Sequence, residues 1–175
     1  MLKLADQLAD YAKDIRLNIA SVMTQEGSPG LELKQIWGIA LASAYATKDP
    51  KFFKAVEAET LNVLVTSDID GAKKAAVIMG MSNVYYRFTH YVSDESVTSL
   101  PARLRMNVIA NPGVAKIDFE LYCLAVSAIN GCGKCMNAHA LAVKKLDVRP
   151  EAIQATARIA AVVHACYQAL QIASE

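Results

Sequence analysis

An apolar helical run, a short turn and a second helical run follow one another in residues 119–141, which read FELYCLAVSAINGCGKCMNAHAL. The Asn130-Gly131 pair interrupts the apolar spacing and is a plausible start for the second helix. With that start, Cys132 and Cys135 lie in the first turn of the second helix. The segment therefore predicts two consecutive helices, with a pair of thiols where the second one begins.

Helical spacing of apolar residues extends outward from this segment over almost the whole chain. One predicted stripe is Leu4, Leu8, Tyr11 and Ile15, and another begins with Ile36, Ile39 and Ala40. Residues typical of turns separate these stretches at 27–30, 48–50, 111–113, 130–131 and 149–150. The short runs at 63–65 and 97–99 are expected to be helix ends or loops. The sequence therefore predicts an all-α fold of about seven or eight helices without a long linker.

The sequence contains two pairs of similar segments, and the two members of each pair are separated by nearly the same number of residues. Residues 40–44 (ALASA) resemble 124–128 (LAVSA), and residues 75–78 (AAVI) resemble 160–163 (AAVV). This predicts a single domain over residues 1–175 that contains an internal duplication, with a scaffold repeat at about 1–95 and a catalytic repeat at about 96–175. Only the second repeat contains the thiol pair, because the matching position of the first falls near residues 48–50.

Composition and charge exclude several classes of function. The 18 basic and 17 acidic residues are spread along the chain, so there is no basic stripe for nucleic acid. Charged residues interrupt each apolar stretch before it reaches membrane-spanning length. Asp6 and Asp10 fall where a signal peptide needs an unbroken apolar region, so we expect a cytoplasmic protein. Four cysteines are too few for a secreted disulfide scaffold, which points to reactive or metal-binding thiols.

Cys132 and Cys135 have a spacing and a setting that suit thiol chemistry. The free amide groups and the positive dipole end of a helix N-terminus favour a thiolate, and Lys134 adds positive charge. Side chains three residues apart share one face of a helix, so this pair can close a disulfide. His139, four residues after Cys135, is a candidate base or proton relay. Glu120 could orient its ring if the two helices pack antiparallel.

The remaining candidates have simpler interpretations. Cys123 and Cys166 lie in apolar helical surroundings and are expected to be core residues. His90 and His164 have no chemical neighbours in the sequence, so we assign them no role.

A structural metal module is an alternative function for the same residues. Cys132, Cys135, His139 and Glu120 are all possible ligands, but a structural zinc site usually takes two more ligands from a second knuckle, and the sequence contains none. A general disulfide reductase without peroxidase activity is a further alternative.

The motif of Glu120 followed by residues 132–139 (CGKCMNAH) resembles the active-site pattern of the AhpD alkylhydroperoxidase family, in the carboxymuconolactone decarboxylase-like superfamily. The resemblance continues through residues 36–38, 79–87 and 104–113. It implies an internally duplicated helical fold that assembles as a trimer or a hexamer. It also implies that Cys135 is the thiol oxidised by an alkyl hydroperoxide, that Cys132 resolves it, and that Glu120 and His139 relay protons. From the residues alone, Cys132 would be the nucleophile, since it lies nearer the helix start.

The resemblance further implies partners and an electron source. The expected partner is the peroxiredoxin AhpC, which the protein would return to its reduced form. Electrons would come from dihydrolipoamide on a lipoylated acyltransferase subunit, with no bound cofactor. The chain departs from the family pattern at Lys134, where well-known members carry histidine. A lysine supplies charge but does not shuttle protons near neutral pH, which favours disulfide exchange over direct peroxidase turnover. A decarboxylase like other superfamily members is disfavoured, because those enzymes work without a redox thiol pair.

Overall fold

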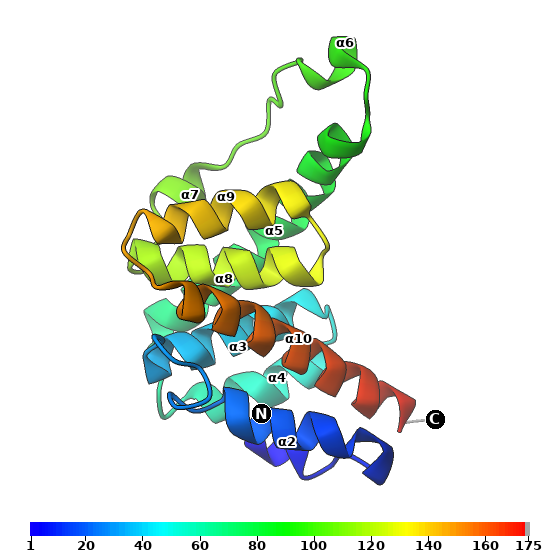
Figure 1. The fold of residues 1–175 in the computed structure, drawn as a ribbon, viewed down its shortest axis with the longest axis vertical. Helices are drawn as coiled ribbons and strands as arrows, with labels where there is room; N and C mark the ends of the chain where they lie inside the picture. Colours follow the sequence, from blue (N-terminus) through cyan, green and yellow to red (C-terminus); the bar gives the residue numbers. More distant parts are fainter. Residues whose placement is uncertain (174–175) are drawn as a thin grey trace.

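The computed structural model describes residues 1–173, and within them the chain is entirely helical (Figure 1). Its elements are α1 (Leu2–Ala5), the 3-10 helix η1 (Asp10–Ala12), α2 (Lys13–Val22), α3 (Leu33–Ala46), α4 (Pro50–Thr60), α5 (Thr66–Tyr91), α6 (Glu95–Thr98), α7 (Asn107–Ala110), α8 (Lys116–Ile129), α9 (Gly133–Lys144) and α10 (Pro150–Ile172). The all-α prediction is confirmed. The predicted number of helices matches the longer ones, while α1, α6 and α7 are single turns of four residues that the spacing did not reveal.

Helices α3 and α8 form the centre of the fold, and α5 and α10 pack against both of them. Both central helices are apolar around most of their circumference, which suits helices covered on several sides. They approach closely at Gly38, where a Cβ atom would lie 2.2 Å from Oη of Tyr122. The glycine therefore lets α3 accept the ring of a fully buried tyrosine from α8.

Local sequence signals set where the helices begin. At α4, the Oδ1 atom of Asp49 accepts a hydrogen bond from the backbone N–H of Phe52 at 2.8 Å, and Pro50 occupies the first turn. At α5, Oδ2 of Asp68 accepts from the backbone N–H of Val65 at 3.2 Å. Residues 63–65 lie between helices, and Thr98 ends the short α6, as the sequence predicted.

The predicted stripe at the N-terminus is not one helix. The chain turns between α1 and η1, so Leu4 and Leu8 are buried whereas Tyr11 is exposed. The Oη atom of Tyr11 instead donates a hydrogen bond to the carbonyl oxygen of Ala169 in α10 at 2.8 Å. Apolar spacing alone did not detect the break, because the turn contains no glycine or proline.

Two sets of three helices occur in the same order along the chain. Helices α3, α4 and α5 begin at Leu33, Pro50 and Thr66, and α8, α9 and α10 begin at Lys116, Gly133 and Pro150. The two sets are thus spaced as the sequence similarity between residues 40–44 and 124–128 suggests. The internal duplication itself stays a prediction.

The end of α5, α6 and the chain leading to α7 extend away from the helical body as an arm (Figure 1). Apolar side chains are exposed along it, namely Phe88, Tyr91, Val97, Leu100 and Leu104. No helix within residues 1–173 combines the length and the apolar character needed to cross a membrane.

Candidate active site

The site lies on the antiparallel hairpin of α8 and α9 (Figure 1). Helix α8 ends at Asn130 in a Schellman motif, in which the backbone N–H of Gly131 donates to the carbonyl of Ala128 and that of Cys132 donates to the carbonyl of Ser127. Gly131 has a φ of 68°, which suits a residue without a Cβ. The predicted helix start at Asn130-Gly131 is therefore wrong, because these two residues end α8.

Cys132 is itself the N-cap of α9. Its Sγ atom accepts a hydrogen bond from the backbone N–H of Cys135 at 3.3 Å, so a sulfur takes the place that a hydroxyl or carboxylate usually fills at this position. The unpaired amide groups at the start of α9 therefore point toward the sulfur, as expected for a site that stabilises a thiolate.

Cys132 and Cys135 form a disulfide, with their Cα atoms 5.3 Å apart. The pairing that their spacing favoured is thus present. The two sulfurs differ in their surroundings, because Cys132 is 0% exposed whereas Cys135 is 5% exposed and lines the cavity described below. A molecule in that cavity would meet Cys135 first.

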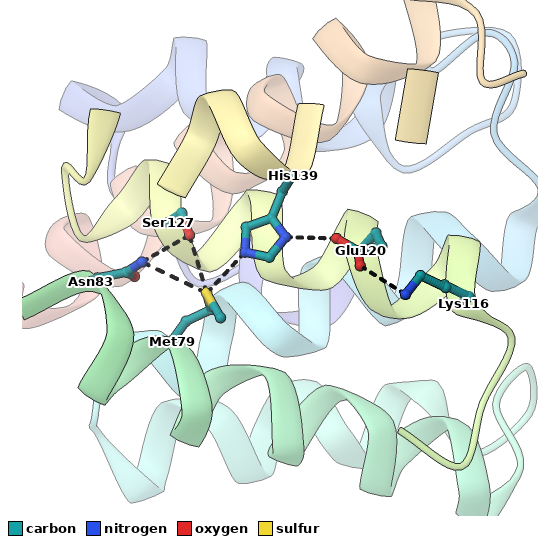
Figure 2. A network of polar contacts seen from close by, with 6 residues as sticks. All are labelled: Met79, Asn83, Lys116, Glu120, Ser127 and His139. Atoms are coloured by element: carbon teal, nitrogen blue, oxygen red, sulfur yellow. Dashed lines mark hydrogen bonds and ion pairs between the residues drawn. The ribbon is translucent and has the colours of Figure 1, made fainter. Parts of the chain in front are cut away.

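His139 and Glu120 are in direct contact, as the antiparallel packing of α8 and α9 allows (Figure 2). Nδ1 of His139 lies 2.7 Å from Oε2 of Glu120, and both side chains are buried. A carboxylate oxygen accepts, so the hydrogen belongs on Nδ1. Nζ of Lys116 lies 3.8 Å from Oε1 of the same carboxylate and balances its charge. The i,i+4 spacing of Lys116 and Glu120 is a signal by which the sequence could have revealed this lysine.

The opposite edge of the imidazole, at Nε2, contacts a methionine that the sequence analysis did not identify as a site residue (Figure 2). Nε2 of His139 lies 3.2 Å from Sδ of Met79 in α5. The hydroxyl of Ser127 donates to the same sulfur at 3.4 Å, and Nδ2 of Asn83 lies 3.7 Å from it and donates to Oγ of Ser127 at 2.9 Å. No local pattern marks Met79 as a site residue, since it reaches His139 only through the packing of α5 against α9.

Lys134 extends from the first turn of α9 toward α5. Its Nζ atom lies 3.5 Å from Oγ1 of Thr89 and 5.5 Å from the centre of the Tyr86 ring. The ammonium group thus has a hydroxyl and an aromatic face as neighbours, and its side chain lines the same cavity as Cys135.

A cavity of about 530 Å³ opens onto the site. Cys135, His139 and Met79 form part of its wall, and the apolar remainder comes largely from Met106, Ile109, Ala110, Ala138 and the Tyr86 ring. Helix α7 and the residue before it supply three of these side chains, so the short helix that the sequence did not reveal covers the redox centre.

The remaining thiols lie away from this centre. Cys123 and Cys166 are buried and unbridged, which confirms their assignment to the core. Burial raises the pKa of the Cys123 thiol well above its usual value, and it raises the pKa of Cys166 to about 11. His90 is exposed beside Tyr91, and the ring of His164 lies near that of Tyr167. Neither histidine is among the residues of the disulfide site.

Comparison with known proteins first defines the class of the site. Residues 96–175 match the model of the carboxymuconolactone decarboxylase family. The matched part contains α8, α9 and α10, and with them the disulfide and the Glu120–His139 pair. The second part of the chain is therefore similar to this class, and it contains the disulfide-bonded cysteine pair.

Relatives that match over nearly the whole chain identify the family. Alkyl hydroperoxide reductase AhpD of Hyphomonas neptunium is 52% identical over 93% of this chain and 89% of its own. AhpD of Coxiella burnetii is 49% identical over 93% and 92%, and AhpD of Brucella abortus is 48% identical over 97% and 95%. The chain belongs to the AhpD family, which confirms the resemblance of its motif.

Proposed function

We propose that the protein is an antioxidant thiol-disulfide peroxidase, which reduces alkyl hydroperoxides through Cys132 and Cys135. One observation carries the proposal. The disulfide caps the start of α9, and its Cys135 sulfur shares a cavity with the imidazole of a buried His139–Glu120 pair. A nucleophile, a resolving thiol and a proton relay therefore lie within one hairpin. The names of the relatives, alkyl hydroperoxide reductases, support the same reaction class.

The reaction needs one proton delivered to each departing oxygen. The Cys135 thiolate attacks the distal oxygen of the hydroperoxide, the O–O bond breaks, and the alkoxide takes a proton from His139 to leave as an alcohol. The Cys135 sulfenic acid then reacts with Cys132, the S–O bond breaks, water leaves and the disulfide forms. Glu120 keeps the hydrogen on Nδ1 of His139 and stabilises the charged ring, so that Nε2 is the atom that exchanges protons.

The exposures of the two sulfurs support Cys135 as the attacking thiol. Cys132 lies nearer the helix start, which would favour it as the nucleophile. Its side chain is fully buried, however, and its sulfur accepts a hydrogen bond from the backbone N–H of Cys135. A hydroperoxide in the cavity would reach Cys135 without moving the backbone. Lys134 would favour the thiolate by its charge alone.

Reduction of the disulfide completes the cycle. We propose dihydrolipoamide, carried by a lipoylated acyltransferase subunit, as the donor: its two thiols reduce the protein disulfide by exchange and become lipoamide. The same dithiol of the protein would reduce an oxidised peroxiredoxin AhpC. We propose the cytoplasm as its location, because thiols are kept reduced there.

We also propose that the protein forms a homotrimer or a hexamer. The exposed apolar residues of the arm, among them Phe88, Tyr91 and Leu100, support an assembly that covers them. Sedimentation of the purified protein would reveal the state, and a monomer at micromolar concentration would contradict it.

A coupled assay tests the proposed activity. Reduced lipoamide is supplied with an organic hydroperoxide, with and without a peroxiredoxin, and lipoamide formation is followed. Direct turnover supports the peroxidase. Turnover only in the presence of peroxiredoxin favours the alternative, a general disulfide reductase, which the change from histidine to Lys134 makes a real competitor.

The metal module has less support. Within residues 1–173 no three or more histidine, cysteine, aspartate or glutamate side chains are grouped so that they could hold a metal ion. Metal analysis together with thiol titration tests it, because stoichiometric zinc without titratable thiols would favour the module.

A further inference from the structure

The cavity at Cys135 is much larger than a small peroxide needs. Its volume of about 530 Å³ compares with roughly 30 Å³ for one water molecule in the liquid. The walls contributed by Met106, Ile109, Ala110 and Ala138 are apolar. Hydrogen peroxide would leave most of this space to water, whereas an alkyl chain would displace water from it and bury apolar surface.

Two lysines from opposite ends of the α8–α9 hairpin line the cavity. Lys134 lies just after the hairpin turn, whereas Lys116 is the first residue of α8 and therefore lies at the other end of the antiparallel pair. The Glu120–His139 contact sits one helical turn inward from Lys116, and Cys135 lies one turn beyond His139. With a rise of 1.5 Å per residue, the backbone positions of Lys116 and Cys135 are separated by about 12 Å along the hairpin, and the Lys116 side chain reaches inward to Glu120.

The two ammonium groups differ in their neighbours. Nζ of Lys134 sits beside the Thr89 hydroxyl and over the Tyr86 ring, at the end where the reacting oxygen has to be. Nζ of Lys116 has a long 3.8 Å contact to Glu120, and its side chain is 57% exposed. Lys116 can therefore accept a second anionic partner at the end of the cavity away from the disulfide.

We infer that the site selects amphipathic hydroperoxides, in which an alkyl chain joins the hydroperoxide to a carboxylate that pairs with Lys116. The inference rests on the proposed peroxidase function and names its substrate class. The chain lies along the apolar wall of α7, the carboxylate is at Lys116 and the hydroperoxide is at Cys135. The chemical step is the one given above, since the carboxylate only binds.

The ratio of kcat/KM for an acid and for its ester isolates the role of the carboxylate. The substrates are 10-hydroperoxydecanoic acid and its methyl ester, which share the reacting group and the chain. Dihydrolipoamide, at saturating concentration, is the donor. The wild-type protein is expected to prefer the acid by about three- to fivefold, the scale of one partly exposed ion pair. Lys116→Met should bring the ratio to about one, even if its loss beside Glu120 slows both substrates.

Lys134→Met is the matched control. It removes a positive charge from the same cavity and should slow both substrates, while it leaves the preference for the acid. Equal kcat/KM values for the acid and the ester in the wild type, with both turned over, would overturn the inference and leave the peroxidase intact. Loss of the preference in Lys134→Met but not in Lys116→Met would also overturn it, because the head group would then be at the wrong end.

A binding measurement separates failure of the inference from failure of the proposed function. Calorimetry on the oxidised protein compares decanoate with decanol, neither of which can react. Tighter binding of decanoate in the wild type, lost in Lys116→Met, supports the inference even if no hydroperoxide is turned over. Equal binding of the two ligands, or no binding of decanoate, contradicts it.

Discussion

Nε2 of His139 lies 3.2 Å from the sulfur of Met79, on the side of the ring opposite Glu120. Since Nδ1 donates to the carboxylate, this sulfur can accept a hydrogen bond only from the doubly protonated ring. In the proposed relay, Met79 would hold the imidazole in place while the ring carries the proton for the leaving oxygen. Met79→Leu keeps the volume and removes the acceptor, so we expect kcat to fall about three- to tenfold with less than about 1.5 kcal/mol lost in unfolding free energy.

Met106→Leu is the control for this change, because Met106 lines the same cavity and its sulfur contacts Ser82 and Tyr86 in place of His139. Nitrogen NMR of the His139 ring should change in Met79→Leu and not in Met106→Leu. Equal effects of the two leucines on kcat and on the ring signals would reduce Met79 to a packing residue.

Glu120 and His139 are expected to act as one unit. Glutamine at either position should lower peroxidase turnover by roughly a hundredfold, since each removes the oriented proton relay. The double variant should have a turnover only slightly lower than that of the slower single variant, because the effects of residues that work together are not additive. Steady-state kinetics of the three variants check this. Losses that multiply, or an unchanged rate for Glu120→Gln, would rule out the relay.

Lys134 is expected to act through its charge. Replacement by methionine should lower the thiolate fraction of the reduced pair and slow alkylation by iodoacetamide at neutral pH, whereas arginine should largely preserve the rate. Because iodoacetamide is uncharged, the charge at residue 134 does not itself change the rate at which the reagent reaches the thiols. Equal alkylation rates for the wild type and both variants would remove Lys134 from the mechanism.

Cys123 and Cys166 should stay unreactive under conditions in which Cys132 and Cys135 are alkylated. In the reduced protein at pH 7, alkylation and mass mapping should label Cys132 and Cys135, because burial raises the pKa of Cys123 well above its usual value and that of Cys166 to about 11. A thiol with a raised pKa stays protonated until the pH passes that value, so Cys166 should gain reactivity only toward pH 11. Main labelling of Cys123 or Cys166 at pH 7 would contradict the assignment.

Gly38 and Gly80 offer a matched pair for testing the helix crossing. A Cβ at Gly38 would lie 2.2 Å from Oη of Tyr122, whereas one at Gly80 meets nothing within 4 Å. We expect Gly38→Ala to cost about 1–3 kcal/mol in unfolding free energy through overpacking, and Gly80→Ala to gain up to about 1 kcal/mol from helix propensity. Urea unfolding measures both. An unchanged unfolding free energy in Gly38→Ala would mean that the ring of Tyr122 moves aside without loss of stability.

Local patterns were enough to predict the all-α class, the breaks between the main helices and the five candidate site residues. They were enough because helical spacing, turn residues and a Cys-x-x-Cys pair are properties of neighbouring positions. The one local error at the site has a local cause as well. Asn130 and Gly131 suit a helix end as well as a helix start, and the Schellman bonds to Ser127 and Ala128 that distinguish the two depend on how α8 stops.

Only the tertiary structure decided which groups surround the thiol pair. Met79 and Tyr86 come from α5 and Met106 from the chain before α7, at sequence separations over which no periodicity operates. The packing of α5 against the hairpin, with α7 lining the other part of the wall, forms the cavity, and it leaves Cys132 enclosed and Cys135 on the wall. The sequence by itself determined the candidate site residues, because the spacing that marks them involves neighbouring positions. The structure alone decided which of the two cysteines lines the cavity, because the cavity wall is made of side chains that meet only after the chain has folded.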